Sequence, residues 1–158
     1  MSQSLLVSTS ENTIRKFFLT GKQHTLTIFG PPGLAGDAGL VLDGSGNVYV
    51  ANIFGNAVRK FSPRGKPLGV FASTGLYFPF ALAFDSAGYL YVGNIGDSTI
   101  RKFSPTGQDL GTFAAPTQCV PESMVFELSG NLLVAGGSSL VCEFSRPVRI
   151  SAYSPQLG

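Results

Sequence analysis

The sequence contains few side chains of the kinds that carry out catalysis or bind metal ions. His24 is the only histidine, and Cys119 and Cys142 are the only cysteines, in a chain of 158 residues. A zinc site normally needs several His or Cys ligands close together, which this set does not supply. The sequence also lacks a glycine-rich phosphate loop, a nucleophile elbow and a Cys-x-x-Cys pair. It therefore predicts no catalytic residue, no metal site and no cofactor.

Three carboxylates spaced 42 residues apart resemble an acid–base or metal-binding set. Asp43, Asp85 and Glu127 are each followed, three positions later, by a glycine. An Asp in this place closes an Asx turn, and the glycine supplies the positive φ of a tight hairpin. We therefore interpret the carboxylates as turn residues on separate repeats. The glycines concerned are Gly46, Gly88 and Gly130.

Three arginines, each followed by a lysine, also recur along the chain: Arg15, Arg59 and Arg101. A row of arginines on one rim would suit phosphate groups. The formal net charge, however, is only +2, whereas a dedicated nucleic-acid binder carries a clear excess of positive charge. We therefore disfavour nucleic acid as the partner and interpret these arginines as surface groups that pair with nearby Asp side chains and carbonyls.

Four aromatic residues form a further candidate binding surface. Phe54 lies in one expected loop, and Tyr77, Phe78 and Phe80 lie in or beside the next. Exposed aromatic side chains are typical anchors of protein interfaces. The alternative is that these rings fill the space between neighbouring sheets. The sequence leaves both interpretations open.

The elements that must position these residues repeat every 42 residues. The segment 39–52 is matched by 81–94 and again by 123–136, and an Arg-Lys-Phe block follows the first two. Each block predicts a strand, because short runs of β-branched and aromatic residues are bounded by Gly, Pro, Asn, Asp or Ser. No long stretch has helical periodicity. The sequence therefore predicts an all-β fold with four strands in each repeat, named a to d here.

The hydrophobic pattern indicates that both faces of each sheet are covered. Strands a and b are apolar on both faces, as at 40–42 and 48–50. A period of roughly 40–50 residues with four antiparallel strands, each sheet packed between two others, is typical of a β-propeller blade. The pattern Asp-x-x-Gly-Asn-x-Tyr-Val-x-Asn, which starts at Asp43 and is followed by Gly-Asn-x-Val-Arg-Lys-Phe, resembles the NHL repeat of bacterial repeat arrays.

The NHL resemblance covers residues 5–113 closely and 123–155 more loosely, and it departs from the family pattern in places. Asn52 and Asn94 stand where members usually carry Asp, and the Asn-His-Leu tripeptide is absent. NHL propellers include protein-binding, RNA-binding and lyase members, so the fold alone does not fix the function. The resemblance implies a non-catalytic binding or scaffold module. The alternative is a lyase-like propeller enzyme with a metal-assisted site in its central channel.

The strand count predicts an incomplete propeller in one domain. The first copy starts at its strand b, and we expect about 3.5 four-stranded blades, with approximate repeats 4–36, 37–78, 79–120 and 121–158. For strand c of the last copy, residues 150–155 match better than 141–145, because they restore the Ser-Pro that follows this strand in two other copies.

An incomplete propeller leaves two sheet edges and two apolar faces open, which invites association. Either the chain is a segment of a longer array, or two chains associate into a homodimer that completes a six-bladed ring of roughly 250 residues. We therefore expect the partner to be another protein or a second copy.

The two cysteines are expected on one rim. Cys119 falls in a loop between repeats and Cys142 in an insertion of the next one, so they form either a disulfide in an exported protein or two buried thiols in the cytosol. The charged fraction of only 13% favours an extracellular or cell-envelope protein. The sequence shows no signal peptide and no membrane span.

Overall fold

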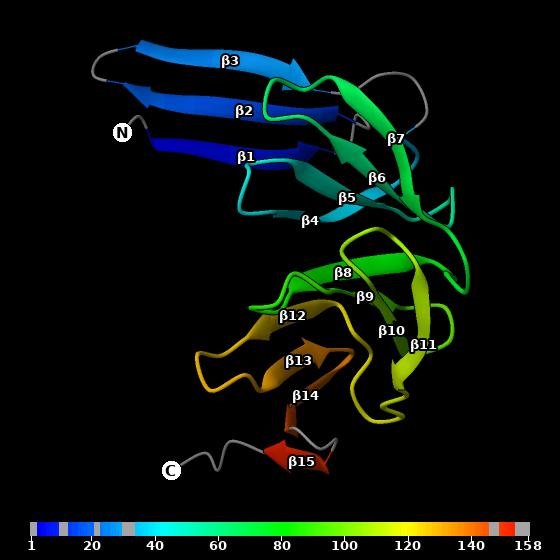
Figure 1. Cartoon of the computed structure of the whole chain (residues 1–158). Helices are drawn as coiled ribbons and strands as arrows, with labels where there is room; N and C mark the ends of the chain where they lie inside the picture. The colour runs from blue at the N-terminus through cyan, green and yellow to red at the C-terminus, as the bar shows by residue number, and fades with distance from the viewer. Residues whose placement is uncertain (1–2, 10–12, 21–22, 30–33, 146–148, 154–158) are drawn as a thin grey trace.

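The computed structural model describes residues 3–9, 13–20, 23–29, 34–145 and 149–153, and this part of the chain contains strands and no helix. Four antiparallel sheets follow one another in chain order along an arc (Figure 1), and we call them blades 1 to 4. Each sheet runs in simple sequence order from an inner to an outer strand. The prediction of an all-β partial propeller is confirmed. No helix in the described residues is long and apolar enough to cross a membrane.

Blades 1 and 2 contain seven strands between them. Blade 1 has three strands: β1 (Gln3–Thr9), β2 (Thr13–Thr20) and β3 (Gln23–Phe29). Blade 2 has four: β4 (Asp37–Leu42), β5 (Val48–Asn52), β6 (Ala57–Phe61) and β7 (Pro67–Ala72).

Blades 3 and 4 have four strands each. Blade 3 consists of β8 (Pro79–Phe84), β9 (Leu90–Asn94), β10 (Thr99–Phe103) and β11 (Asp109–Ala114). Blade 4 consists of β12 (Ser123–Phe126), β13 (Leu132–Gly136), β14 (Ser138–Ser145) and β15 (Arg149–Tyr153).

The turn between strands a and b has the predicted Asx geometry. In blade 2, one carboxylate oxygen of Asp43 accepts hydrogen bonds from the backbone N–H of Ser45 at 3.0 Å and of Asn47 at 2.9 Å. Gly46 has a φ of 78°, which an L side chain rarely adopts. Asp85 holds the equivalent turn of blade 3 in the same way. The turn interpretation of these two Asp residues is confirmed.

The core consists of three layers, each between two neighbouring blades. All five residues of β5 and all five of β9 are buried, as the pattern of apolar residues on both faces predicts. Between blades 3 and 4, for example, Tyr91 and Ile100 of blade 3 share a layer with Leu132 and Phe144 of blade 4. Each of these layers is formed by two blades, so a blade face is buried only where a neighbouring blade covers it.

The strand assignment in blade 4 corrects the sequence prediction. Residues 138–145 form strand c, paired with β13, and residues 149–153 form strand d, paired with β14. The expectation that strand c lies at 150–155 was wrong, and blade 4 has four strands. The physical reason is a tight reversal at Gly136 and Gly137, with φ of 147° and 67°, which starts strand c directly after strand b.

Candidate binding rim

Two kinds of loop meet at one rim of the array. In blades 2 and 3, the loop between strands b and c pairs with the loop that leads into that blade from the previous one. In blade 2, the N–H of Ile53 donates to the carbonyl of Gly36 at 3.1 Å; in blade 3, the N–H of Ile95 donates to the carbonyl of Phe78 at 3.0 Å. Residues distant in sequence therefore lie side by side on this rim.

Three of the four predicted aromatic residues form a cluster on the rim, which we call the aromatic trio: Phe54, Tyr77 and Phe78. The ring centroids of Phe54 and Phe78 are 6.3 Å apart with an interplanar angle of 85°, and those of Tyr77 and Phe78 are 4.9 Å apart. Phe54 is 70% exposed and Tyr77 is 49% exposed. Phe80 lies in β8, is half-buried, and forms no ring pair with the trio.

The backbone around the trio is built to present these rings. Phe78 has a φ of 50°, a value that is a genuine outlier for a bulky side chain, and its N–H donates to the side-chain oxygen of Asn56 at 2.9 Å. Glycines leave room for the rings: a Cβ on Gly36 would meet the Phe54 ring at 2.7 Å, and one on Gly96 would overlap the Tyr77 ring. The rings of Phe54 and Tyr77 are exposed at this rim, whereas Phe78 is half-buried beneath them.

Two buried asparagines hold the rim together, and sequence reasoning did not assign them this role. The side-chain oxygen of Asn52 accepts from the N–H of Ala35 at 2.9 Å, and that of Asn94 accepts from the N–H of Tyr77 at 3.2 Å. The Asn94 amide also donates to the carbonyl of Gly75 at 3.1 Å. An amide offers both a donor and an acceptor to a loop backbone, which a carboxylate cannot do. The signal was the return of Asn at the end of strand b, 42 residues apart.

The three predicted arginines lie in strand c of three separate blades, on β2, β6 and β10. The guanidinium of Arg101 forms an ion pair with Asp109 and donates to the hydroxyl of Thr112 at 3.1 Å, so it is engaged within blade 3. Arg15 and Arg59 are half-buried. The three arginines thus lie on three separate blades, and one of them is already paired with a carboxylate.

The carboxylates of the a–b turns are engaged by their own turns. Besides the two backbone N–H groups, Asp43 accepts from the side chain of Asn47 at 2.8 Å and from the hydroxyl of Tyr49 at 3.2 Å. Burial alone would raise the pKa of Asp43, but hydrogen bonds from Asn47, Ser45 and Tyr49 outweigh it and bring the pKa below its ordinary 3.8. Burial raises the pKa of Tyr49 above 10.0.

The rim of a–b turns also contains a hollow of about 510 Å³ between blades 3 and 4, lined in part by Asp85 and Glu127. One Asp85 oxygen accepts two backbone N–H groups of its turn and the other accepts the Tyr91 hydroxyl at 3.3 Å. Across the described ranges, no three His, Cys, Asp or Glu side chains lie close enough together to hold a metal ion.

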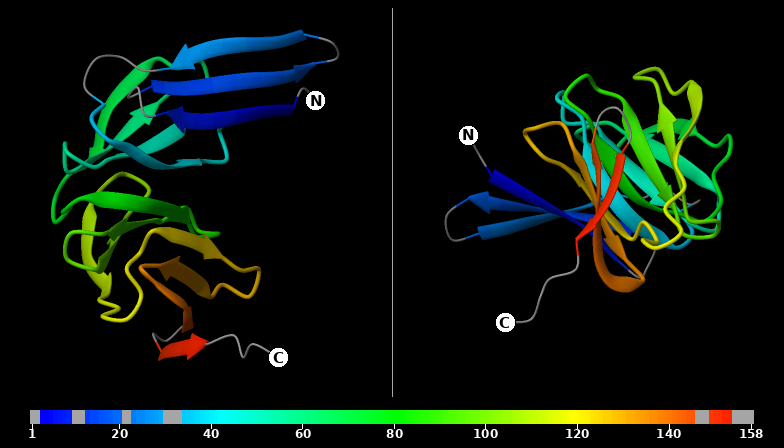
Figure 2. Two further views of the ribbon diagram at one scale, coloured as in Figure 1. Left: turned by 180° about the vertical axis from the view of Figure 1, so that it is seen from behind. Right: turned by 90° about the horizontal axis from the view of Figure 1, so that it is seen from below.

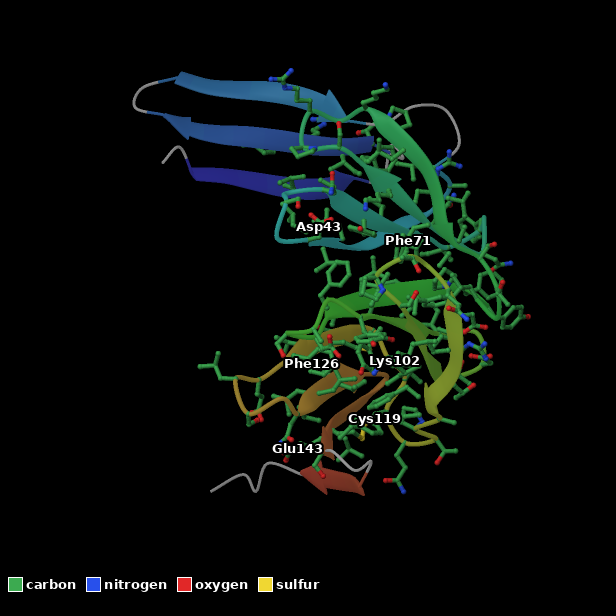
Figure 3. All side chains as sticks on the ribbon, in the orientation of Figure 1. Asp43, Phe71, Lys102, Cys119, Phe126 and Glu143 are labelled. Atoms are coloured by element: carbon green, nitrogen blue, oxygen red, sulfur yellow. A yellow bond between two sulfur atoms is a disulfide. The ribbon has the colours of Figure 1, made fainter. Side chains whose placement is uncertain are left out.

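Cys119 and Cys142 form a disulfide that spans 23 residues, with their Cα atoms 6.2 Å apart. Figure 3 shows the yellow sulfur atoms beside the labelled Cys119, in the loop between β11 and β12. Cys142 lies within β14 and not, as the sequence suggested, in an insertion between strands b and c. The disulfide therefore joins the loop that enters blade 4 to the third strand of that blade.

The comparisons with known proteins support the fold and no closer relationship. No family model and no curated protein matches the chain. The structure of virginiamycin B lyase from Staphylococcus aureus matches with a TM-score of 0.72 at 14% identity, over 96% of this chain and 55% of that one. A streptogramin B lyase structure matches with a TM-score of 0.72 at 17% identity, over 96% and 54%.

A structure of a nidogen/laminin complex matches with a TM-score of 0.81 at 17% identity, over 100% of this chain and 64% of that one. The chain thus spans 54% to 64% of the length of these three solved structures. At such low identity the likeness shows the β-propeller fold alone.

Proposed function

We propose that this chain is a non-catalytic propeller module of NHL type that binds a protein partner through the aromatic trio. The observation that carries the proposal is that the aromatic rings are exposed although the surrounding backbone is arranged to hold them. Phe54 and Tyr77 leave much of their ring area in water, and yet two loops, two glycines and a buried asparagine are arranged around them. Exposed aromatic side chains on a rigid frame are typical of binding hot spots.

The backbone strain at Phe78 supports the same proposal. A bulky residue held at positive φ costs of order 1–3 kcal/mol, and such strain gathers at functional sites. The N–H of Phe78 is held by Asn56, so the neighbouring loop maintains the strained conformation. The Phe78 ring in turn supports the ring of Tyr77. The matched nidogen/laminin structure supplies a precedent for a propeller chain found in a protein complex.

The alternative is a lyase-like activity, suggested by the matched lyase structures and by the hollow that Asp85 and Glu127 line. It is the weaker proposal, because both oxygens of Asp85 already accept hydrogen bonds within blade 3, one from its own turn and the other from the hydroxyl of Tyr91. A lyase-like site would retain Ca, Zn or Mg through purification in stoichiometric amount. We expect metal analysis of the purified chain to find none of these ions at that level.

The test of the binding proposal is a peptide selection. Random twelve-residue peptides displayed on phage are selected on the purified chain, and the enriched peptides are then titrated against variants. The double substitution Phe54→Ser/Tyr77→Ser should weaken their binding by about tenfold or more, because truncation of hot-spot aromatics costs at least about 2 kcal/mol. Thermal unfolding of this variant should stay close to that of the parent, since both rings are exposed.

The matched control is Leu68→Ser/Val70→Ser on β7, where two apolar side chains are 51% and 56% exposed on an outer strand. This control should leave peptide binding unchanged. Equal losses in both variants, or a sharp loss of stability with unchanged binding, would contradict the role of the trio.

A further inference from the structure

Blades 2 and 3 each have an arginine at the same place in strand c. By strand register, Arg59 and Arg101 each pair with the middle valine of strand b in their own blade. In blade 3, the guanidinium of Arg101 forms an ion pair with Asp109 and donates to the hydroxyl of Thr112 at 3.1 Å. Both partners lie on β11, the outer strand of the blade. Blade 3 therefore shows which group binds this arginine when strand d supplies one.

Blade 2 lacks both of these partners. By the register of strands c and d, Pro67 occupies the place of Asp109. Val70 likewise occupies the place of Thr112. Neither of these side chains offers an acceptor to a guanidinium. Within the part of the chain that the structure describes, Arg59 forms no side-chain hydrogen bond and no ion pair. Its charge is thus left without a partner.

The unpaired guanidinium is partly withdrawn from water but can still be reached. Arg59 is half-buried, and its side-chain nitrogens keep contact with solvent. A charge that loses part of its hydration without gaining a partner is unfavourable. The neighbouring residues 67–70 of β7 are all exposed, and β7 lies on the outside of the arc (Figure 2). The site is therefore open to a second molecule.

The surroundings of Arg59 indicate the chemistry of that molecule. Blade 2 contains more basic than acidic residues, and this excess favours an anionic partner. The basic ones are Arg59, Lys60, Arg64 and Lys66, and the acidic ones are Asp37 and Asp43. On β7, Leu68 and Val70 are 51% and 56% exposed, and Val70 pairs with Arg59 across the strands. Apolar surface beside a cation suits an acidic side chain with apolar neighbours better than the evenly charged backbone of a nucleic acid.

We propose that Arg59 binds a carboxylate of a protein partner, in the position that Asp109 fills for Arg101. A guanidinium and a carboxylate form strong charge-assisted hydrogen bonds, often two at once. Leu68 and Val70 contact the apolar residues beside that carboxylate. Arg101 is already paired, so blade 3 does not offer a second site of this kind. The proposal goes beyond the aromatic trio and does not depend on it.

The experiment measures the binding of a labelled acidic peptide by fluorescence anisotropy at low ionic strength. The probe is a capped ten-residue peptide of alternating Glu and Val, and the same peptide with Gln in place of Glu is the uncharged control. Arg59→Gln should raise the Kd of the acidic peptide by about tenfold or more, because a charge-assisted pair is lost. Arg64→Gln removes the same charge from the exposed c–d turn of blade 2 and should change the Kd by about twofold or less.

A second variant tests the geometry without removing the arginine. Pro67→Asp/Val70→Thr gives blade 2 the two partners that Arg101 has in blade 3. The new carboxylate should occupy Arg59 and weaken the binding of the acidic peptide by about tenfold, while the thermal unfolding temperature should not fall. Circular dichroism of each variant confirms that the fold is retained. Unchanged peptide binding in this variant would contradict the position proposed for the carboxylate.

Four further results would overturn the proposal. Absence of binding, or equal binding of the Gln peptide, would show that no anion site exists. Equal losses in Arg59→Gln and Arg64→Gln would show that only the general charge of blade 2 attracts the peptide. A ten-nucleotide single-stranded RNA that binds more tightly than the peptide, and depends on Arg59, would assign the site to phosphate. Displacement of the peptide by micromolar citrate at matched ionic strength would assign it to a small acid. Phe54→Ser/Tyr77→Ser should leave this peptide bound, which keeps the test separate from that of the trio.

Discussion

Blades 3 and 4 use different chemistry to fasten the loop that leads into each of them from the previous blade. In blade 3, the amide of Asn94 binds the N–H of Tyr77 and the carbonyl of Gly75, and the guanidinium of Arg101 lies over Gly75. In blade 4, the disulfide between Cys119 and Cys142 joins the corresponding loop to strand c. The geometry of the repeat is thus kept while a polar contact is exchanged for a covalent one.

The exchange has a steric reason. Gly136 occupies the place of Asn94, and a Cβ there would overlap the carbonyl of Val120, so no asparagine fits. Cys142 pairs with Val134 as Arg101 pairs with Val92, so Cys142 also takes the place of the arginine. Blade 4 therefore lacks the asparagine that fastens the loop in blade 3 and the arginine that lies beside this loop, and the disulfide stands in their place. This comparison predicts that each blade fails when its own fastening is removed.

The largest expected effect is the loss of the disulfide. The double substitution Cys119→Ala/Cys142→Ala should lower the free energy of unfolding by about 3 kcal/mol, because a closed loop of this length restricts the unfolded chain by that amount. The measurement is denaturant unfolding followed by circular dichroism. A reducing agent should destabilise the parent chain by a similar amount and leave the double variant unaffected.

Thiol titration provides the independent control. The parent chain, unfolded without reduction, should show no free thiol. Two free thiols would show that Cys119 and Cys142 do not form a disulfide. The loop that enters blade 4 would then be held by non-covalent contacts alone.

The second effect concerns blade 3. Asn94→Ala should lower the free energy of unfolding by about 2 kcal/mol, because the N–H of Tyr77 and the carbonyl of Gly75 lose the fully buried side chain that bonds them both. Denaturant midpoints measure this loss. The control is Asn131→Ala in the a–b turn of blade 4, where a half-buried asparagine bonds one side chain, Glu143. A change of less than about 0.5 kcal/mol is expected there, and equal losses at the two sites would contradict the fastening role of Asn94.

Much of the fold could be predicted because the turns have local causes. Asp43 and Gly46 fix the a–b turn through bonds within five residues, and such a cause is visible in the sequence. The burial of strand b on both faces follows from its composition alone. The strands of blade 4 were harder, since a glycine pair shortens the turn before β14 and a Ser-Pro match drew the prediction to the wrong segment.

The candidate site could be predicted only in part. Local composition placed Phe54, Tyr77 and Phe78 in facing loops, but it included Phe80, which the pleat of β8 turns away from the trio. The role of Asn94 depends on a loop 19 residues earlier, and no local pattern reports such a contact. The sequence therefore does not reveal the non-local hydrogen bonds that hold this site.

The smallest effect extends the comparison to the a–b turns. Asp43 in blade 2 bonds two backbone N–H groups, whereas Glu127 in blade 4 bonds only the hydroxyl of Ser129. Because hydrogen bonds lower the pKa of Asp43 in the folded state below 3.8, its ionised form stabilises the fold above that pH. This contribution is lost as the pH falls through the lowered folded-state pKa.

Asp43→Asn should therefore cost less than about 1 kcal/mol at neutral pH, and the difference from the parent should shrink only below the ordinary pKa of 3.8. Denaturant midpoints of both chains, measured from neutral pH down to about pH 2.5, follow this difference. A difference that widens toward low pH would mean that the protonated form of Asp43 is the stabilising one. In that case the charge of Asp43 would not stabilise the turn of blade 2, and the turns of blades 2 and 4 would differ only in the length of the acidic side chain.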